Sequence, residues 1–393
     1  MRFPEFHGEW CVSTIGEQFD LYSGNTPSRL NKEHFEGNVN WITSGELKEH
    51  YISDTKEKIS EDAATANNLK LLHPGTFVIA IYGLEADGVR GTGSITCKES
   101  TISQACMAFT QKGDVKNEFL YSWYKKHGNI IGIKYAQGTK QQNLSYDILE
   151  KFHIAYPSQD EQDKLIKFIS LLDERIASQS KLIEDLKKLK SAIIENVFDD
   201  KHSERLQLDN VGSYIRGLTY SSNDVVEHGG TLVMRSNNIV NGSLLDYNNN
   251  VVFVNKQMSA EQQLQNGDIV ICMANGSSSL VGKSSFYDGN WHSPITVGAF
   301  CGIYRSKEPI VKWLFQTNKY RRYIWNSLQG GNGAIANLNG EDILNMSFSI
   351  PNAPIKDTCV KMLTSVDSAL ENNISLCALY TLQKQHLLRQ MFI

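Results

Sequence analysis

Two long stretches of the chain place apolar residues at alternating intervals of four and three positions. Each stretch, 165–197 and 359–391, has ten such positions, and eight of the ten are apolar in both. The two polar interruptions, which are Gln179 and Lys190 in the first stretch, fall at the same places in the second. This spacing over more than four heptads predicts two coiled-coil helices. The apolar seam that we expect consists of Leu165, Ile169, Leu172, Ile176, Ile183, Leu186, Ile193 and Val197 in the first helix, and of Leu363, Val366, Leu370, Tyr380, Leu387 and Met391 in the second.

The rest of the chain consists mainly of short runs rich in Val, Ile, Phe and Tyr, separated by Gly, Asn and Asp. Such runs predict strands joined by turns. The clearest strands follow Pro74-Gly75 and Asn266-Gly267, and helical patches are expected at about 118–127 and 311–325. The pattern therefore predicts an α+β protein with two α/β globular domains and two long helices.

The chain also resembles itself at a shift near 193 residues. Residues 41–47 align with 233–239, and residues 73–79 align with 265–271. A period of this length is too long for a solenoid and indicates a tandem duplication of a globular domain followed by a helix. We expect four parts, namely a first globular domain at 1–156, a helix at 157–198, a second globular domain at 199–350 and a helix at 351–393.

Connectivity gives the direction of the two helices. The first helix leaves the first domain, and the second helix begins where the second domain ends, so we expect an antiparallel pair with a pseudo-two-fold axis. The 33 residues from Leu165 to Val197 would form a rod of about 50 Å, or about 15 base pairs of duplex. The alternative is that each helix is an ordinary amphipathic helix packed on its own domain.

Composition excludes several classes of protein. The chain has 393 residues, 41% of them hydrophobic, with 8 prolines and a formal net charge of −4, which argues against a disordered chain and against a polybasic binder. No apolar run approaches the roughly 20 residues that span a bilayer, and the N-terminus has no apolar signal region. Seven cysteines without a C-x-x-C pair indicate reduced thiols. We therefore expect a cytoplasmic protein that makes no membrane contact.

Local charge is more informative than the total. Residues 119–146 and 309–340 contain no acidic residue, and each segment carries four basic residues among interleaved aromatic residues. Because Lys and Arg neutralise phosphates whereas amides and Arg read base edges, these segments predict a nucleic-acid interface. A solvated helix face with the aromatic residues in the core is the alternative. The expected phosphate contacts are Lys125, Lys126, Lys134, Lys140, Lys319, Arg321 and Arg322, and the candidates for base readout are Gln141, Gln142, Arg235, Asn237 and Asn238.

Catalytic motifs are weak by comparison. The segment 276–284 resembles a phosphate loop, but it has five residues between its glycines where the motif requires four. The segment 331–336 resembles a dinucleotide fingerprint without a clear preceding strand. Asp20 with Glu46 and Lys48 has the loose spacing of a metal-dependent nuclease site, and His and Cys do not pair at ligand spacing. We expect no catalytic residue and no metal site in this chain.

Several short motifs, in a fixed order, resemble the specificity subunits of type I restriction-modification enzymes. These motifs are Arg2-Phe-Pro-Glu-Phe6 with Trp10, Trp41-Ile-Thr-Ser-Gly45, Leu72-His-Pro-Gly75, Gly138-Thr-Lys-Gln-Gln-Asn-Leu144, Ile154-Ala-Tyr-Pro157 with Glu161-Gln162, and Leu171-Leu-Asp173 with Ile176. The resemblance covers essentially the whole chain, including its duplication. The second repeat departs from the pattern, since Ile355-Lys356 stands where Glu-Gln is expected, and Gly333-Ala334 precedes Asn337-Leu338 without the Thr or Gln pair.

The resemblance implies two target-recognition domains that each read one half of a bipartite, asymmetric double-stranded DNA site, with the helices fixing the gap. It implies a chain that is non-catalytic by itself and that docks two modification subunits, which methylate adenine N6, and through the complex the restriction subunits. S-adenosylmethionine, ATP and Mg²⁺ are then expected on those partners, with no cofactor in this chain. The alternative functions are a self-sufficient metal-dependent endonuclease on a duplicated DNA-binding scaffold, and a coiled-coil scaffold that never touches DNA.

Overall fold

The computed structural model describes residues 2–85, 88–136, 142–199, 204–247, 249–328 and 336–392. The chain forms two compact units. Unit 1 consists of Met1–Ser180 with Ser375–Ile393, and unit 2 consists of Lys181–Ile374. The two long helices, α5 (Gln159–Val197) and α10 (Ala353–Met391), each contribute one half to each unit. The expected four-part division had treated each long helix as a segment of its own.

Unit 1 is built on a five-stranded sheet with the strand order β2-β9-β6-β7-β4, accompanied by a three-stranded sheet, β5-β3-β8, and the pair β1-β10. The strands are β1 (Cys11–Thr14), β2 (Phe19–Ser23), β3 (Val39–Ile42), β4 (Tyr51–Ile52), β5 (Lys58–Ile59), β6 (Phe77–Ala80), β7 (Gly93–Thr96), β8 (Ser100–Ile102), β9 (Cys106–Gln111) and β10 (His153–Tyr156). The shorter helices are α1 (Ile15–Gln18), η1 (Lys32–Phe35), η2 (Ser44–Glu46), α2 (Glu61–Ala66), α3 (Asn117–Tyr135) and α4 (Tyr146–Glu150).

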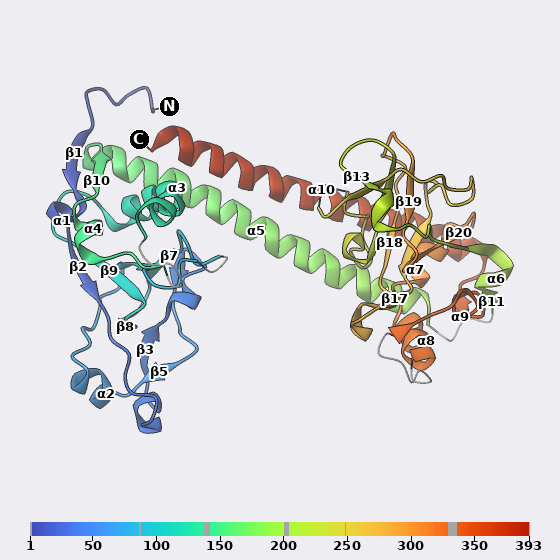
Figure 1. Ribbon diagram of the computed structural model, residues 1–393, viewed down its shortest axis with the longest axis horizontal. Coiled ribbons are helices and arrows are strands. Elements are labelled where there is room, and N and C mark those ends of the chain that lie inside the picture. The colour runs from blue at the N-terminus through green and yellow to red at the C-terminus, as the bar shows by residue number, and fades with distance from the viewer. Residues whose placement is uncertain are drawn as a thin grey trace. The chain divides into compact units, whose positions relative to one another are not determined.

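Aromatic residues join the sheet of unit 1 to helix α3. Phe77 on the central strand β6 is fully buried, with ring centroids 5.5 Å from Phe109 and 6.0 Å from Tyr121. Strand β6 is the strand predicted after Pro74-Gly75. All four of its residues are apolar and buried, as in a strand that is covered on both faces. The sheet and α3 lie beside the first half of α5 (Figure 1).

Unit 2 contains a four-stranded sheet, β12-β20-β16-β18, a second four-stranded sheet, β13-β15-β14-β19, and the pairs β11-β22 and β17-β21. The strands are β11 (Glu204–Gln207), β12 (Gly212–Arg216), β13 (Val225–Val226), β14 (Thr231–Met234), β15 (Val252–Val254), β16 (Ile269–Cys272), β17 (Ala274–Asn275), β18 (Ser284–Phe286), β19 (Ile295–Val297), β20 (Cys301–Ser306), β21 (Ala336–Asn337) and β22 (Ser347–Ile350). Its shorter helices are α6 (Leu208–Val211), η3 (Ser222–Asp224), η4 (Ser236–Asn238), η5 (Ser278–Leu280), α7 (Val311–Leu314), α8 (Asn318–Leu328) and α9 (Gly340–Leu344).

The two units repeat one topology, so the duplication seen in the sequence is also a duplication of fold. The order β2-β9-β6-β7 in unit 1 recurs as β12-β20-β16-β18 in unit 2, and the pair β1-β10 recurs as β11-β22. The aligned segments 41–47 and 233–239 each end a buried strand and enter a short 3-10 helix with a capping box. The chain is an α+β protein with two globular parts of the same design.

The long helices run antiparallel where they pair within each unit. In unit 1, Arg175 donates to the Tyr380 hydroxyl at 3.2 Å, and Asp173, which lies earlier on α5, pairs with Lys384, which lies later on α10. In unit 2 the second half of α5 pairs with the first half of α10 through Lys190 and Asp367. All twenty expected seam positions, including the polar interruptions, are buried or half-buried, and most of the flanking positions are exposed. None of the helices in the described parts of the chain is both long enough and apolar enough to cross a membrane.

Candidate nucleic-acid interface

A pocket of about 570 Å³ in unit 2 brings together two of the residues expected to read bases, Arg235 and Asn237. Arg235 is the capping residue of η4, and one of its terminal nitrogens donates to the Asn250 carbonyl at 2.9 Å. Its Nε is buried without a hydrogen-bond partner, so the guanidinium retains an unused donor. Asn237 is exposed, and Phe300, which also lines the pocket, is 68% exposed. The pocket therefore combines amide and guanidinium donors with an apolar contact, as base readout requires.

Asn238 has a structural role instead of the base-reading role expected for it. Its side chain is fully buried, and its carbonyl oxygen accepts a hydrogen bond from the Arg235 backbone at 2.9 Å. Its amide nitrogen donates to the carbonyl oxygens of Asp246 and Asn249 at 3.1 and 2.7 Å. The start of η4 thus occupies the oxygen of the amide and the loop that follows η4 occupies its nitrogen, so this buried side chain is not available to a base edge.

A second cleft of about 250 Å³ lies between the segment 276–283 and helix α8 in unit 2. Lys283 and Arg321 line this cleft together with the hydroxyl groups of Ser278 and Ser279 and with Trp325, which is 65% exposed. The Tyr320 hydroxyl donates to the Gly282 carbonyl at 2.8 Å and so holds the segment against the helix. Two cations, hydroxyl donors and an accessible indole suit a phosphate–sugar backbone with an adjacent base or sugar.

The segment 276–284 is not a nucleotide-binding phosphate loop. Lys283 is followed directly by strand β18, whereas a phosphate loop leads into a helix whose N-terminus faces the phosphate. The related dinucleotide-like segment, 331–336, lies outside the described residues except for its last position. The segment that has five residues between its glycines, where the motif requires four, thus leads into a strand and not into the helix of a phosphate loop.

The pocket and the cleft are connected within unit 2. The Asn275 amide, which immediately precedes the 276–283 segment, donates to the Ser236 hydroxyl of the pocket at 3.3 Å. Arg321 also borders a further cavity of about 270 Å³ lined by Lys187 and Asn241. A polar, positively charged strip therefore runs from Arg235 past Asn275 to Arg321, on short loops and one helix end.

The other basic residues expected in unit 2 differ in availability. Arg321 is exposed and is oriented by hydrogen bonds to the Asn318 side chain at 3.2 Å and to the Gln316 carbonyl at 3.5 Å. Arg322 is exposed, whereas Lys319 is half-buried and already interacts within the chain. Arg321 and Arg322 are thus the stronger phosphate candidates of the three.

In unit 1 the lysines at the centre of α3 make contacts inside the protein. Lys125 lies over the Tyr121 ring, 5.1 Å from its centroid, and burial, with repulsion from Lys384, lowers its pKa to about 8. Lys126 donates to the Phe392 carbonyl at the end of α10. Lys126 thus joins α3 to the end of α10, and Lys125 packs on its own helix, so both half-buried ammonium groups already make contacts within unit 1, and their role as phosphate contacts stays a prediction.

The remaining candidates of unit 1 lie near the end of α3. Lys134 is exposed beside Tyr135, with its ammonium 5.2 Å from the ring centroid. The Gln142 side-chain oxygen accepts from Arg90 at 3.0 Å, which engages that side chain in a contact within the loop. Lys140 and Gln141 lie outside the described residues, so their role stays a prediction.

Most aromatic residues of the basic segments belong to the core. Tyr121, Trp123 and Tyr124 are buried in unit 1, and Trp313 and Tyr320 are buried in unit 2. The alternative drawn from the sequence, a charged helix face over an aromatic core, therefore describes most of each segment. Trp325 on α8, which is 65% exposed, is a clear exception that composition could not distinguish from the buried aromatic residues.

The loose nuclease motif does not form a metal site. Asp20 is exposed on β2, 3.0 Å from Lys112. One Glu46 oxygen accepts from the Thr43 backbone at 2.8 Å, and the other accepts from the Lys56 backbone at 2.7 Å. Within the described ranges there is no cluster of three or more His, Cys, Asp or Glu residues that could hold a metal.

The two lysines in the seam, Lys190 and Lys384, have acidic partners that were not predicted from the sequence. Asp367 is 5% exposed and binds Lys190 at 2.7 Å and Lys312 at 2.8 Å, and it accepts from the Trp313 indole at 3.0 Å. Burial lowers the pKa of Lys190, and Asp367 opposes that change. A lysine in an apolar seam requires a counter-ion, so acidic residues at matching repeat positions were the available signal.

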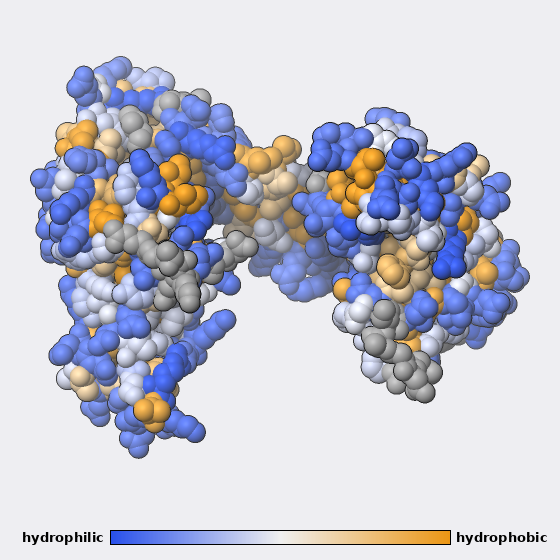
Figure 2. Space-filling view, viewed as in Figure 1, coloured by the Kyte–Doolittle hydropathy of each residue, from blue (hydrophilic) through white to orange (hydrophobic). Residues whose placement is uncertain are grey.

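Apolar side chains are also exposed on the long helices. In the part of α10 that belongs to unit 1, Leu379 and Leu382 are both 60% exposed, and Leu376 is 36% exposed. Figure 2 shows apolar groups on the surface of the helical region among mostly hydrophilic ones. Exposed apolar groups that recur along one helix indicate a surface for a partner.

Comparison with known proteins gives one consistent family. Residues 7–188 match the model of the type I restriction modification DNA specificity domain. The chain is 28% identical over 196 residues to the type I restriction enzyme MjaIX specificity subunit of Methanocaldococcus jannaschii, covering 49% of this chain and 44% of that protein. It is 35% identical over 155 residues to the EcoKI specificity subunit of Escherichia coli K12, covering 37% of this chain and 31% of that protein. The matched regions therefore span less than half the length of these relatives.

Solved structures extend the likeness of fold to the whole chain. The type I restriction-modification S subunit from M. genitalium has a TM-score of 0.61 at 16% identity, covering 100% of this chain and 99% of that chain. A chain solved in work on complex assembly and conformational transition of the type I R-M system has a TM-score of 0.56 at 12% identity, covering 98% of each chain. The resemblance predicted from the sequence is thus confirmed: the first half of the chain matches the type I restriction modification DNA specificity domain, and the whole chain shares its fold with solved type I S subunits.

Proposed function

We propose that this chain is the DNA sequence-recognition subunit of a type I restriction-modification complex, that it reads a bipartite asymmetric site, and that it is non-catalytic by itself. The observation that carries this proposal is a repeated fold with different polar side chains at equivalent places. Where unit 1 has Thr43 and Gly45 around η2, unit 2 has Arg235 and Asn237 around η4. Different side chains at one position of a shared scaffold select different base edges.

Within the strip of unit 2, we assign base recognition and phosphate binding to different residues. Arg235 and Asn237 contact base edges, because they carry bidentate donors and lie in the open pocket. Lys283, Arg321 and Arg322 bind phosphates and set the register of the protein on the duplex. In unit 1, Lys134 is the exposed candidate for the same role.

The partners that we propose are two modification subunits, which dock on the helices, and restriction subunits, which join through the complex. The exposed leucines of α10 support a docking surface for an apolar helix face of a partner. S-adenosylmethionine, ATP and Mg²⁺ belong to those partners in this proposal. We place the complex in the cytoplasm, where its duplex substrate is found.

Charge placed on this surface should release the partner. We expect Leu379→Glu with Leu382→Glu to weaken binding of the cognate modification subunit about 100-fold, since each buried leucine is worth about 1.5–3 kcal/mol. Titration calorimetry with the purified modification subunit measures the change. Gln383→Glu with Gln385→Glu adds the same charge at exposed polar positions of the same segment and is the matched control. Equal affinity of both double variants would refute this surface.

Methylation mapping tests the function as a whole. One heptad is inserted into α5 and one into α10 at facing positions, so that the antiparallel pairing is preserved. The insertion lengthens the helices by about 10 Å, and we expect the gap between the half-sites to grow by about three base pairs while both half-sites stay the same. Sequencing of modified adenines in cells that carry the modification subunit reads the site directly. Absence of any methylation that depends on the wild-type chain, or half-sites that change with the insertion, would overturn the proposal.

A further inference from the structure

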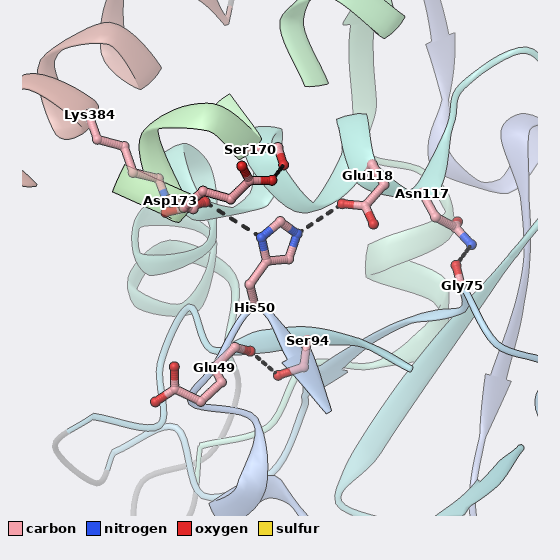
Figure 3. Close-up of polar contacts among 10 residues, drawn as sticks. Glu49, His50, Gly75, Ser94, Asn117, Glu118, Ser170, Asp173 and Lys384 are labelled. Atoms are coloured by element: carbon pink, nitrogen blue, oxygen red, sulfur yellow. Dashed lines mark hydrogen bonds and ion pairs between the residues drawn. The ribbon is translucent and has the colours of Figure 1, made fainter. Parts of the chain in front are cut away.

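The His50 ring lies at the joint between the globular part of unit 1 and its long-helix segments. It is stacked between two tyrosine rings, with centroids 4.1 Å from Tyr51 and 3.9 Å from Tyr121 and interplanar angles of 8° and 1°. This sandwich fixes the plane of the imidazole and directs its two nitrogens outward in opposite directions (Figure 3). Flat contact with two aromatic faces also favours a cation in the middle.

Each nitrogen of His50 faces a carboxylate from a different helix. Nε2 lies 2.9 Å from Glu118 Oε2 on α3, and Nδ1 lies 3.5 Å from Asp173 Oδ2 on α5. The other oxygen of Asp173 binds Lys384 on α10. One imidazole therefore links the loop before β4 to α3, to α5 and, through Asp173, to α10, all within unit 1.

The contact with Asp173 requires a proton on Nδ1. Both Nδ1 and Asp173 Oδ2 are buried, and neither has a hydrogen-bond partner within the usual geometry. In a neutral ring that donates through Nε2 to Glu118, the lone pair of Nδ1 would face a carboxylate oxygen. The doubly protonated ring donates to both carboxylates, which supplies a partner for each of the two buried atoms.

The corresponding joint of unit 2 contains lysines and a backbone carbonyl in place of the histidine. The repeat places Gly242 where unit 1 has His50, and the Gly242 carbonyl accepts from the Lys190 ammonium at 2.9 Å. Asp367, the repeat equivalent of Asp173, is neutralised by Lys190 and Lys312 instead. Burial lowers the pKa of Lys190, but Asp367 opposes that change, and lysine starts from an ordinary pKa of about 10.4, far above the value of about 6.5 for histidine.

We propose that His50 is a proton-dependent positioning residue: its protonated form holds the globular part of unit 1 on the helix segments of that unit, whereas the corresponding joint of unit 2 does not respond to pH. The inference concerns the joint and not DNA contact, so it stands or falls separately from the proposed function. The two units of the duplicated chain would then differ in how their joints respond to pH.

The charges around the ring determine the direction of the effect. Burial disfavours the charged ring, but the close approach of the Asp173 and Glu118 carboxylates and their negative charges outweigh burial, so the pKa of His50 is raised. Lys384 and Lys125 oppose protonation from α10 and α3, and Glu49 adds a negative charge from the same loop. Tyr51, with its pKa raised to about 12 by burial, and Tyr121, whose pKa burial also raises, stay neutral.

A raised pKa in the folded state fixes the sign of the linkage. Stabilisation by His50 is fully present below the pKa of an unfolded histidine, about 6.5, and is lost as the pH rises through the higher folded-state value. The joint of unit 1 is therefore expected to be tight under mildly acidic conditions and looser above the folded-state pKa. Lys125, with a pKa lowered to about 8, also loses charge in this region and must be removed as a variable.

The first test is direct titration of His50 by NMR in the full chain, with assignment from the His50→Gln variant. We expect a pKa above that of a free histidine, and we expect Glu118→Gln to shift it downward. A wild-type pKa at or below the ordinary value would overturn the proposal without any assumption about how the variants fold.

The second test is hydrogen exchange followed by mass spectrometry between pH 6 and pH 9, corrected for the intrinsic rate at each pH, in a Lys125→Met background. We expect protection of residues 159–180 and 375–391 to fall about tenfold as pH rises, as for loss of a charged hydrogen bond, while residues 181–197 and 353–374 stay constant. His50→Gln should give the high-pH protection at every pH, and His73→Gln, at an exposed histidine, should behave as the parent. A pH response that survives in His50→Gln, or one equal in both units, would refute the assignment.

Discussion

Asp367→Ala is expected to lower the free energy of unfolding by about 3–5 kcal/mol, since it leaves the buried Lys190 and the half-buried Lys312 without a counter-ion. The Asp367 carboxylate is the common partner of Lys190, Lys312 and the Trp313 indole. Lys190 is itself 5% exposed, so water cannot replace the lost charge at low cost. Urea unfolding followed by far-UV circular dichroism measures the change.

Two control variants separate the charge network from the helix. Asp357→Ala removes an exposed aspartate from the same helix and should change stability by less than about 0.5 kcal/mol. Lys190→Met keeps the volume of the seam and leaves Asp367 with Lys312 and the indole, so it should cost less than Asp367→Ala. A loss below about 1 kcal/mol for Asp367→Ala would show that the network contributes no more than an exposed ion pair.

Removal of the charges at Lys283, Arg321 and Arg322 together should weaken DNA binding about 100-fold at 0.15 M salt. Each phosphate contact releases counter-ions and contributes about 0.9 to the slope of log affinity against log salt, so three contacts contribute about 2.7. Phosphate contacts carry no sequence information, and the loss should therefore be equal for random duplexes and for the recognised site. Fluorescence anisotropy at several salt concentrations, with the chain bound to its modification subunits, measures both quantities.

The matched control carries the same loss of charge elsewhere in unit 2. Lys256→Ala, Lys307→Ala and Lys361→Ala together remove three charges that lie outside the strip around Arg321. This triple variant should keep nearly the full salt slope, because only long-range attraction is reduced. A slope that falls equally in both triple variants would show that net charge, and not this strip, attracts the duplex.

The long helices and the duplication could be predicted because both are periodic in the sequence. Seam positions over 165–197 and 359–391 were expected from their spacing, and the helices begin six residues earlier, at Gln159 and Ala353. Local turn chemistry likewise located strands β6 and β16 after their Gly-containing turns. Antiparallel pairing followed from connectivity, which requires no knowledge of side-chain contacts.

The contacts of individual side chains could not be predicted in the same way. Asn238 and Asn237 are neighbours of the same type, yet one caps a loop in the interior and the other faces a pocket. Lys125 and Arg321 occupy similar basic segments, but Lys125 is drawn into the joint of α3 with the long helices. Such differences arise from long-range packing, which composition and spacing do not encode.

The ion pairs of the two long helices are reciprocal: the aspartate of each helix binds the lysine of the other. All four residues, Asp173, Lys190, Asp367 and Lys384, lie outside the globular segment 204–350. Recombination that replaced this segment with one from a related gene would thus leave both pairs intact and would exchange their partners in the segment, Gly242, Lys312 and Trp313. A new globular segment could therefore be acquired while the ion pairs between the long helices are retained.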